Sequence, residues 1–309
     1  MLRRPLGKTG LQVSVLSYGA SSLGAVFHAV NEDDGIRAVH TALDLGINFI
    51  DVSPFYGLTK AETVLGKALK GVARDRYILA TKAGRYGADA FDFSARRVTK
   101  SVDESLARLG VDHVDLIQCH DIEFGDLKQV VDETIPALRR LREAGKVKFI
   151  GVTGLPLPAL QYVVERTHVD TILSYCRYSL NDTGLESLLP LLRQKNVGVI
   201  NASPLSMGLL TDRGAPDWHP AGPEIRAACA AAAELCRHRG TDIAKLAVQY
   251  SVACPEIATT LVGTASPEYI RNNIQWCEQP MDGDLLHDVL EILKPIANKT
   301  WPSGRPENN

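Results

Sequence analysis

Short apolar runs recur along this chain, and nearly every run is followed by a segment with the periodicity of an amphipathic helix. Several runs are too apolar to alternate, which is typical of strands buried on both faces of a parallel sheet. Successive runs mostly start about one strand–helix unit apart. The runs expected to be strands are 15–20, 48–51, 77–81, 114–118, 149–153, 171–174, 198–202 and 260–262. Eight such units predict an α/β fold of the (β/α)8, or TIM, barrel type.

Two doubly wound halves are the alternative for a chain of 309 residues. A dinucleotide-binding half should carry G-x-G-x-x-G after its first strand, and residues 19–24, Gly-Ala-Ser-Ser-Leu-Gly, do not match that pattern. The sequence therefore favours one barrel domain over residues 1–309. Residues 1–15 contain a Gly-Lys-Thr-Gly turn and are expected to form a β-hairpin that closes the barrel floor. Residues 282–309 are expected to form a C-terminal helix and tail.

Three details of the helices can also be predicted. Asn31, followed by three acidic residues, is expected to cap a helix N-terminus. Pro136 interrupts an apolar stripe that starts at Leu127, so a helix is expected to start afresh there. The long interval before the last strand holds two helical patterns, 224–239 and 243–253.

Composition excludes several classes of function. Lys and Arg number 34 and Asp and Glu 36, so the net charge is −2 and there is no basic footprint for nucleic acid. No apolar run is long enough to span a membrane, and the start lacks a signal stretch, so we expect a cytoplasmic protein. The six cysteines form no C-x-x-C pair and are expected to be buried free thiols. The eight histidines show no H-x-H or H-E-x-x-H spacing, and no metal is expected.

Four residues with compatible chemistry follow three consecutive predicted strands. Asp51 ends one strand and precedes Tyr56, Lys82 ends the next, and His120 follows the third. In a barrel these positions lie on one rim. A lysine beside a tyrosine is expected to lower the pKa of the phenol, an aspartate to hold that lysine, and a histidine to bind a substrate oxygen. This arrangement would make Tyr56 a proton carrier.

Each of these residues alone has an ordinary structural explanation. Asp51 could cap a turn, Lys82 could be solvated, and a lone histidine is more often structural than catalytic. The conjunction of all four on adjacent strand ends is what favours an active site.

The blocks Asp51–Gly57, Ala80–Lys82 and Gln118–His120 resemble the catalytic tetrad of the aldo-keto reductases. The resemblance covers nearly the whole chain and implies that Asp51, Tyr56, Lys82 and His120 are catalytic. It also implies a nicotinamide dinucleotide on the barrel rim without a Rossmann motif. The residues implied to hold it are Thr153, Ser174, Ser203, Leu205, Gly208, Gly263, Thr264, Tyr269, Asn272 and Asn273.

Departures from the family pattern bear on the cofactor. Thr153-Gly154 stands where many members have Ser-Asn, and Ala202 where many have an aromatic residue. Gly263 and Tyr269 stand where NADP-dependent members carry a basic pair for the 2′-phosphate. NAD is therefore expected rather than NADP, although Arg271 lies close by in the sequence.

Longer blocks narrow the resemblance to family members that act on L-galactose. These blocks are 91–95, 120–125, 172–176, 218–220 and 300–304. They imply NAD-linked oxidation of L-galactose at C1 to L-galactono-1,4-lactone, a step toward ascorbate, with hydride passing to the nicotinamide and the proton to Tyr56. The substrate would be lined by Phe27, Phe55, Tyr56, His120, Asp121 and Trp218.

Three alternatives remain open at this point. The enzyme could act on a related aldose such as L-fucose or D-arabinose, which differ from L-galactose only at or beyond C5. It could be an NADPH-linked carbonyl reductase, or a cofactor-sensing β-type regulatory subunit of the same family. No partner beyond a small sugar is expected, and the sequence leaves monomer and homodimer open.

Overall fold

Eight parallel strands form a closed barrel in the computed structural model, which describes residues 1–26 and 29–309. The order around the barrel is β10-β3-β4-β5-β6-β7-β8-β9. Consecutive strands of the sequence are therefore neighbours, and pairing of β10 with β3 closes the barrel. The barrel strands are β3 (Leu16–Gly19), β4 (Phe49–Asp51), β5 (Ile78–Ala83), β6 (Val114–Cys119), β7 (Val147–Gly154), β8 (Thr171–Tyr175), β9 (Gly198–Ala202) and β10 (Thr259–Gly263). The expected (β/α)8 barrel is confirmed, with each predicted strand within three residues of its observed bounds.

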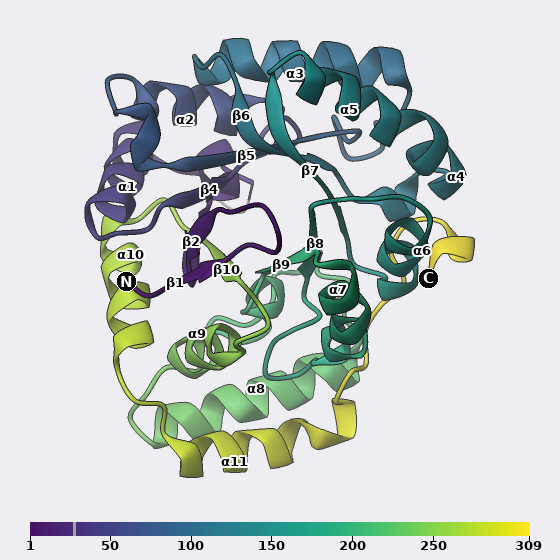
Figure 1. Ribbon diagram of the computed structural model, residues 1–309. Coiled ribbons are helices and arrows are strands. Elements are labelled where there is room, and N and C mark those ends of the chain that lie inside the picture. Colours follow the sequence, from purple (N-terminus) through teal and green to yellow (C-terminus); the bar gives the residue numbers. More distant parts are fainter. Residues whose placement is uncertain (27–28) are drawn as a thin grey trace.

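Helices surround the barrel on its outer side (Figure 1). They are α1 (Glu32–Asp44), α2 (Lys60–Leu69), α3 (Ala95–Leu109), α4 (Leu127–Gln129), α5 (Ile135–Glu143), α6 (Leu157–Arg166), α7 (Leu189–Lys195), α8 (Pro223–His238), α9 (Ile243–Ala253), α10 (Pro267–Glu278) and α11 (Gly283–Leu293). The two helices predicted before the last strand are confirmed as α8 and α9. α8 packs against α11 in a second apolar core outside the barrel.

Of the other two predicted helix details, one is confirmed and one is refined. Asn31 caps α1, and its side chain accepts a hydrogen bond from the Asp34 N–H at 3.2 Å. An α-helix does begin next to Pro136, at Ile135. It continues α4 through one π-helical turn, residues 130–134, so the chain passes the proline without leaving the helical path.

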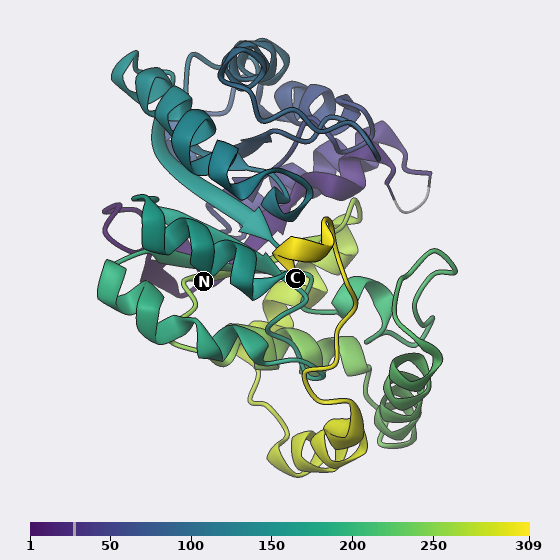
Figure 2. The same cartoon turned by 90° about the vertical axis from the view of Figure 1, so that its right-hand side faces the viewer.

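A hairpin closes one end of the barrel, as predicted. β1 (Arg3–Pro5) pairs antiparallel with β2 (Gln12–Ser14), and the hairpin lies at the opposite end from the long loops (Figure 2). Leu6 and Val13 are fully buried and join the inner barrel core. Gly7 has a φ of +54° and approaches the backbone of Gly198 so closely that a Cβ would lie 2.4 Å from the Gly198 nitrogen.

Alternation along each strand divides the core into two layers. Inward side chains fill the barrel, and outward ones pack under the helices. The inner layer contains Phe49, Ala80, Leu116, Leu173, Ile200 and Leu261. Residues two positions further along β4, β5 and β6 therefore point toward the barrel axis at the rim that the hairpin does not cover.

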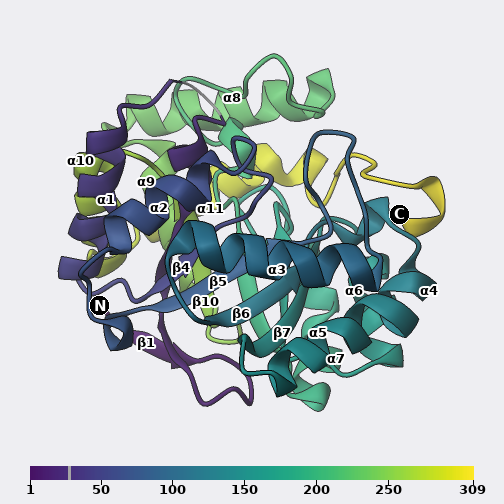
Figure 3. The same cartoon turned by 90° about the horizontal axis from the view of Figure 1, so that it is seen from above.

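The C-terminal segment after α11 returns across this rim. It runs from the outer helices back to the region beyond β6, where the chain ends (Figures 2 and 3). Trp301 is buried and contacts the ring of His219 edge-on, with centroids 4.8 Å apart. The described helices include none that is long and apolar enough to cross a membrane. Of the six cysteines four are buried and two half-buried, and all are free thiols.

Candidate active site

A buried ion pair links the ends of β4 and β5. The Lys82 ammonium contacts the Asp51 carboxylate and also donates to the Val52 carbonyl at 3.1 Å. The second carboxylate oxygen of Asp51 accepts from Gln118 Nε2 at 2.7 Å. Burial would lower the pKa of Lys82, but the Asp51 charge and Tyr56 raise it above its ordinary value. Lys82 therefore stays charged although its side chain is only 1% exposed.

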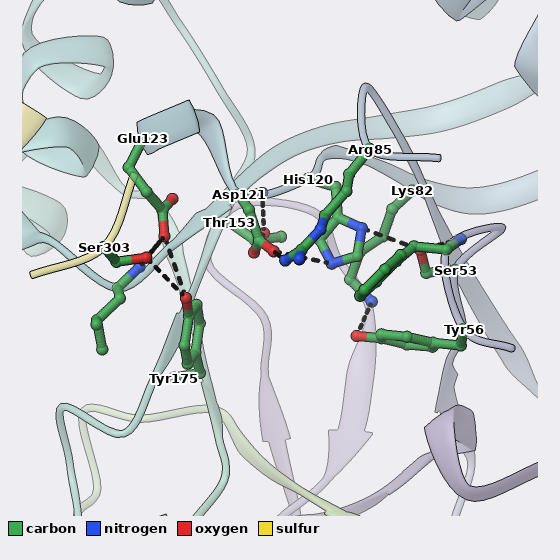
Figure 4. A network of polar contacts seen from close by, with 12 residues as sticks. Ser53, Tyr56, Lys82, Arg85, His120, Asp121, Glu123, Thr153, Tyr175 and Ser303 are labelled. Atoms are coloured by element: carbon green, nitrogen blue, oxygen red, sulfur yellow. Dashed lines mark hydrogen bonds and ion pairs between the residues drawn. The ribbon is translucent and has the colours of Figure 1, made fainter. Parts of the chain in front are cut away.

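Tyr56 lies directly over this pair. Lys82 Nζ is 3.3 Å from the Tyr56 hydroxyl oxygen (Figure 4). Burial raises the pKa of Tyr56, and the attraction of Lys82 offsets only part of that effect, because the charges of Asp51 and Asp121 act against it. Lys82 does lower this pKa, as the sequence predicts, but burial has the larger effect and the net shift is upward. Desolvation outweighs the single cation, and Tyr56 is a neutral phenol.

The loop that carries Tyr56 is fixed by two glycines in contact. Gly57 has a φ of +61°, and a Cβ on it would lie 2.1 Å from the Gly24 carbonyl oxygen. A Cβ on Gly24 would in turn lie 2.7 Å from the Tyr56 carbonyl carbon. Only residues without a side chain allow this approach, so the backbone around Tyr56 has a defined position.

His120 follows β6 and is held in one orientation. Its Nδ1 lies 2.9 Å from Ser53 Oγ, which itself accepts from the Phe55 N–H at 3.1 Å. The Ser53 proton is thus free to point at Nδ1, which leaves Nε2–H as a donor. Burial lowers the pKa of His120 to about 3, so the ring is neutral. It meets Tyr56 edge-on, with ring centroids 5.6 Å apart.

Cys119 precedes His120 but plays no part in this geometry. It belongs to the outer core, under the helices. Burial raises the pKa of its thiol to about 12. The alternation of strand side chains separates the two, as the sequence predicts.

An ion pair that the sequence analysis did not identify adjoins the histidine. Arg85 contacts the carboxylate of Asp121, whose Oδ2 lies 3.6 Å from His120 Nε2. The guanidinium carbon is also 3.9 Å from the ring centre of Phe55. The sequence offered little indication of this ion pair, because Arg85 follows Lys82 by three residues in a loop with no regular pattern. Asp121 was expected near the substrate, but its partner was not.

Glu123 is a second acid that the sequence analysis missed. It is fully buried, and its Oε1 accepts from Leu155 N–H at 3.2 Å, Tyr175 Oη at 3.1 Å and Ser303 Oγ at 3.0 Å (Figure 4). Burial and the charge of Asp121 raise its pKa to about 7. Ser303 belongs to the C-terminal tail, so the contact joins residues 180 positions apart. No local pattern announces such a pairing.

The residues expected to hold a dinucleotide follow the strands on the other part of the same rim. Thr153 lies in β7, Ser174 in β8, Ser203, Leu205 and Gly208 after β9, and Gly263, Thr264, Tyr269, Asn272 and Asn273 in or after β10. Seven of the ten thus lie at or after the C-terminal ends of β7, β8, β9 and β10, whereas Tyr269, Asn272 and Asn273 lie within α10. Thr153 also has an internal role, because its hydroxyl accepts from the Asp121 N–H at 2.9 Å.

This part of the rim suits a dinucleotide. Ser174 Oγ is buried without a hydrogen-bond partner among the described residues. Ser203 and Gly208 have φ values of +57° and +106°, so the loop after β9 turns sharply. The N-terminus of α10, capped by Ser266, faces the loop after β10 and offers N–H groups of the kind that bind phosphate.

Of the other residues predicted to line the substrate, only some lie beside the tetrad. Phe55 and Asp121 lie beside His120, as described. Trp218 lies in the loop after β9 and is 55% exposed, with its ring 6.2 Å from that of His219. Phe27 lies outside the described residues. Within the described residues, no group of three or more His, Cys, Asp or Glu side chains could hold a metal ion.

Comparison with known proteins identifies the family. The sequence matches the Aldo/keto reductase family over residues 15–294. The chain belongs to the aldo-keto reductases. It is 53% identical to L-galactose dehydrogenase from Arabidopsis thaliana over 99% of this chain and 98% of the relative. It is also 31% identical to D-arabinose 1-dehydrogenase from Saccharomyces cerevisiae, with 86% of each chain covered.

A solved structure agrees with the fold of this aldo-keto reductase. The holo form of an aldo-keto reductase from Bacillus halodurans superposes with a TM-score of 0.79, at 28% identity, and 98% of each chain is covered. The family resemblance drawn from the sequence is confirmed. The protein is therefore an oxidoreductase of a family that uses nicotinamide cofactors.

Proposed function

We propose that this aldo-keto reductase oxidises L-galactose at C1 to L-galactono-1,4-lactone, with NAD as the hydride acceptor. The observation that carries the chemistry is the Tyr56 hydroxyl, 3.3 Å from a buried and charged Lys82 and edge-on to a neutral His120. The choice of sugar rests on the relative that shares 53% of the sequence over nearly the whole chain.

In the proposed reaction the anomeric hydroxyl of the cyclic sugar lies between Tyr56 and His120. His120 Nε2–H donates to the reacting oxygen and fixes its position, and Tyr56 Oη takes its proton. The proton acceptor is the phenolate form of Tyr56, whose negative charge Lys82 stabilises until the proton arrives. A bound nicotinamide would accept the hydride that leaves C1. The bond from C1 to the former hydroxyl oxygen thereby becomes a double bond, and the hemiacetal of the five-membered ring becomes the 1,4-lactone.

The dinucleotide would be held by the residues after β8, β9 and β10. We propose that Ser174 and Asn273 contact it and that the start of α10 faces its phosphates. NAD is favoured over NADP by two features of α10. Glu268 puts a negative charge in its first turn, which would repel a 2′-phosphate. Arg271 is two residues from Tyr269, the position where NADP-dependent members carry a basic residue, so its side chain lies on a different face of the helix.

We further propose a cytoplasmic enzyme whose lactone product serves ascorbate formation. The ascorbate assignment concerns the reaction that would consume the lactone. It depends on L-galactose being the substrate.

The experiment is an initial-rate assay of dinucleotide reduction with L-galactose, L-fucose and D-arabinose, each with NAD and with NADP. We expect L-galactose with NAD to give the highest kcat/KM, and Lys82→Met to lower turnover with every sugar by about 10²–10⁴-fold. Equal rates with the three sugars would reduce the proposal to a general aldose dehydrogenase, which the D-arabinose 1-dehydrogenase relative makes the second candidate. A preference for NADP would contradict the assignment of α10. Dinucleotide binding without turnover would favour a cofactor-sensing subunit.

A further inference from the structure

We propose that Asp121 and Arg85 form the subsite for the C2 hydroxyl of the sugar, and so restrict this enzyme to aldoses that carry a hydroxyl beside the reacting carbon. The inference rests on the proposed function, because it assumes an aldose oxidised at C1. It adds a specificity-determining residue, Arg85, and a defined role for Asp121.

Position is the first argument. Asp121 Oδ2 lies 3.6 Å from His120 Nε2, the atom that donates to the reacting oxygen in the proposed reaction. A sugar oxygen that binds beside the reacting oxygen must be bonded either to C1 itself or to the carbon next to it. The two candidates are the C2 hydroxyl and the ring oxygen. A carboxylate only accepts hydrogen bonds, and of the two only the C2 hydroxyl can donate.

Charge is the second argument. Burial would raise the pKa of Asp121, but His120, Arg85 and Lys82 together lower it below its ordinary value. The carboxylate is therefore ionised and can only accept. Its other oxygen, Oδ1, accepts from the Thr153 hydroxyl at 3.3 Å. Oδ2 thus remains with Arg85 on one side and the histidine on the other, where a sugar hydroxyl would complete its hydrogen bonding.

Backbone strain at Asp121 is the third argument. The residue has a φ of +51°, a left-handed conformation that costs free energy in any residue with a side chain. Thr153 Oγ1 holds this conformation by accepting from the Asp121 N–H. Here the turn directs the carboxylate back toward His120.

Arg85 is fixed before any substrate binds. Its guanidinium lies over the ring of Phe55 at 3.9 Å and within 5.1 and 5.3 Å of the stacked rings of Phe91 and Phe124. Figure 4 shows its side chain reaching toward Asp121 and His120. A clamped guanidinium can share its several N–H groups between a carboxylate and a sugar oxygen without reordering.

The test compares an aldose with its 2-deoxy analogue in wild type and variants. The sugar is the aldose that the wild-type enzyme oxidises best, and the quantity is the ratio of kcat/KM with and without the 2-hydroxyl. We expect this ratio to fall about tenfold or more in Asp121→Asn, because a hydrogen bond to a charged group is lost. Arg85→Met keeps the contact with Phe55 and should lower the ratio in the same direction.

The control is a buried ion pair at the other end of the same strand. Asp115 of β6 contacts Arg74 at 2.6 Å and is 5% exposed. Asp115→Asn should leave the ratio unchanged, even if it lowers stability. The proposal is overturned if Asp121→Asn and Arg85→Met reduce kcat/KM by the same factor for both sugars, since the pair would then act only on structure or on His120. Failure of the proposed function would look different, because wild type would oxidise neither sugar.

Discussion

Replacing Glu123 by glutamine should make the protein more stable at neutral pH. Oε1 of this buried acid accepts from three donors, whereas Oε2 lies against Gly154 without a partner among the described residues. The three donors favour the carboxylate. Burial and the nearby charge of Asp121 oppose it more strongly, so the pKa of Glu123 is raised to about 7.

The size of the effect follows from that shift. In the unfolded chain Glu123 has its ordinary pKa of 4.5, against about 7 when folded. Between these two values the folded chain keeps a proton that the unfolded chain has lost, so stability falls as the pH rises through this window and is level on both sides. Each unit corresponds to about 1.4 kcal/mol, so the total loss is about 3 kcal/mol.

The assay is urea unfolding of wild type and Glu123→Gln at intervals from pH 4.5 to 8. The uncharged amide keeps an acceptor for the three donors, so the two proteins should be similar at the acid end. At pH 8 the variant should be more stable by about 3 kcal/mol. Glu165→Gln, at an exposed carboxylate of α6, is the control and should differ from wild type by a constant amount. A Glu123→Gln variant that becomes relatively less stable as the pH rises would show that the three donors outweigh burial.

Three further predictions concern Lys82, Tyr56 and Gly57. Lys82→Met should lower kcat by about 10²–10⁴-fold and, by leaving Asp51 without its partner, lower the free energy of unfolding by about 3–5 kcal/mol, measurable by steady-state kinetics and urea unfolding. Because the pKa of Tyr56 lies above its ordinary 10.0, kcat/KM for sugar oxidation should still be rising at pH 9, and a plateau below pH 8 would contradict a neutral phenol. Gly57→Ala should cost more stability in thermal unfolding than Gly71→Ala, because both glycines have positive φ but only the first Cβ would clash.

The fold could be predicted from the sequence because its main determinants are local. Short apolar runs and helical stripes define strands and helices, and strand alternation decides which side chains face the barrel axis. Asp51, Lys82 and His120 follow three neighbouring strands, so a parallel barrel must bring them to one rim. That reasoning needs no knowledge of side-chain packing.

The electrostatic state of the site could not be predicted in the same way. From the sequence, Lys82 was expected to lower the pKa of Tyr56. The outcome depends on how completely the phenol is removed from water, which is set by packing from several elements. Burial exceeds the effect of one cation here. A pairwise argument from residue types omits the larger of two opposing contributions.

The contact between Glu123 and the C-terminal tail could not be predicted from the sequence either. Glu123 and Ser303 meet only because the C-terminal tail crosses the rim, and Gly304 permits it, since a Cβ there would lie 2.3 Å from the Glu123 carbonyl oxygen. Asn308 adds bonds to the Glu123 and Gly125 carbonyls at 2.8 and 3.0 Å. The sequence predicted a tail over 282–309 but gave no reason for its path.

The charged residues of the rim affect how readily Tyr56 can accept a proton. Asp121 raises the pKa of Tyr56, and so opposes the phenolate that oxidation requires. The carboxylate is tolerable there because Arg85 neutralises it and Glu123, two residues on, stays protonated below about pH 7. A carboxylate beside the reacting atoms would only hinder the proton acceptor unless it served the substrate. The arrangement is therefore best explained if Asp121 is retained for sugar recognition, with Arg85 limiting its effect on Tyr56.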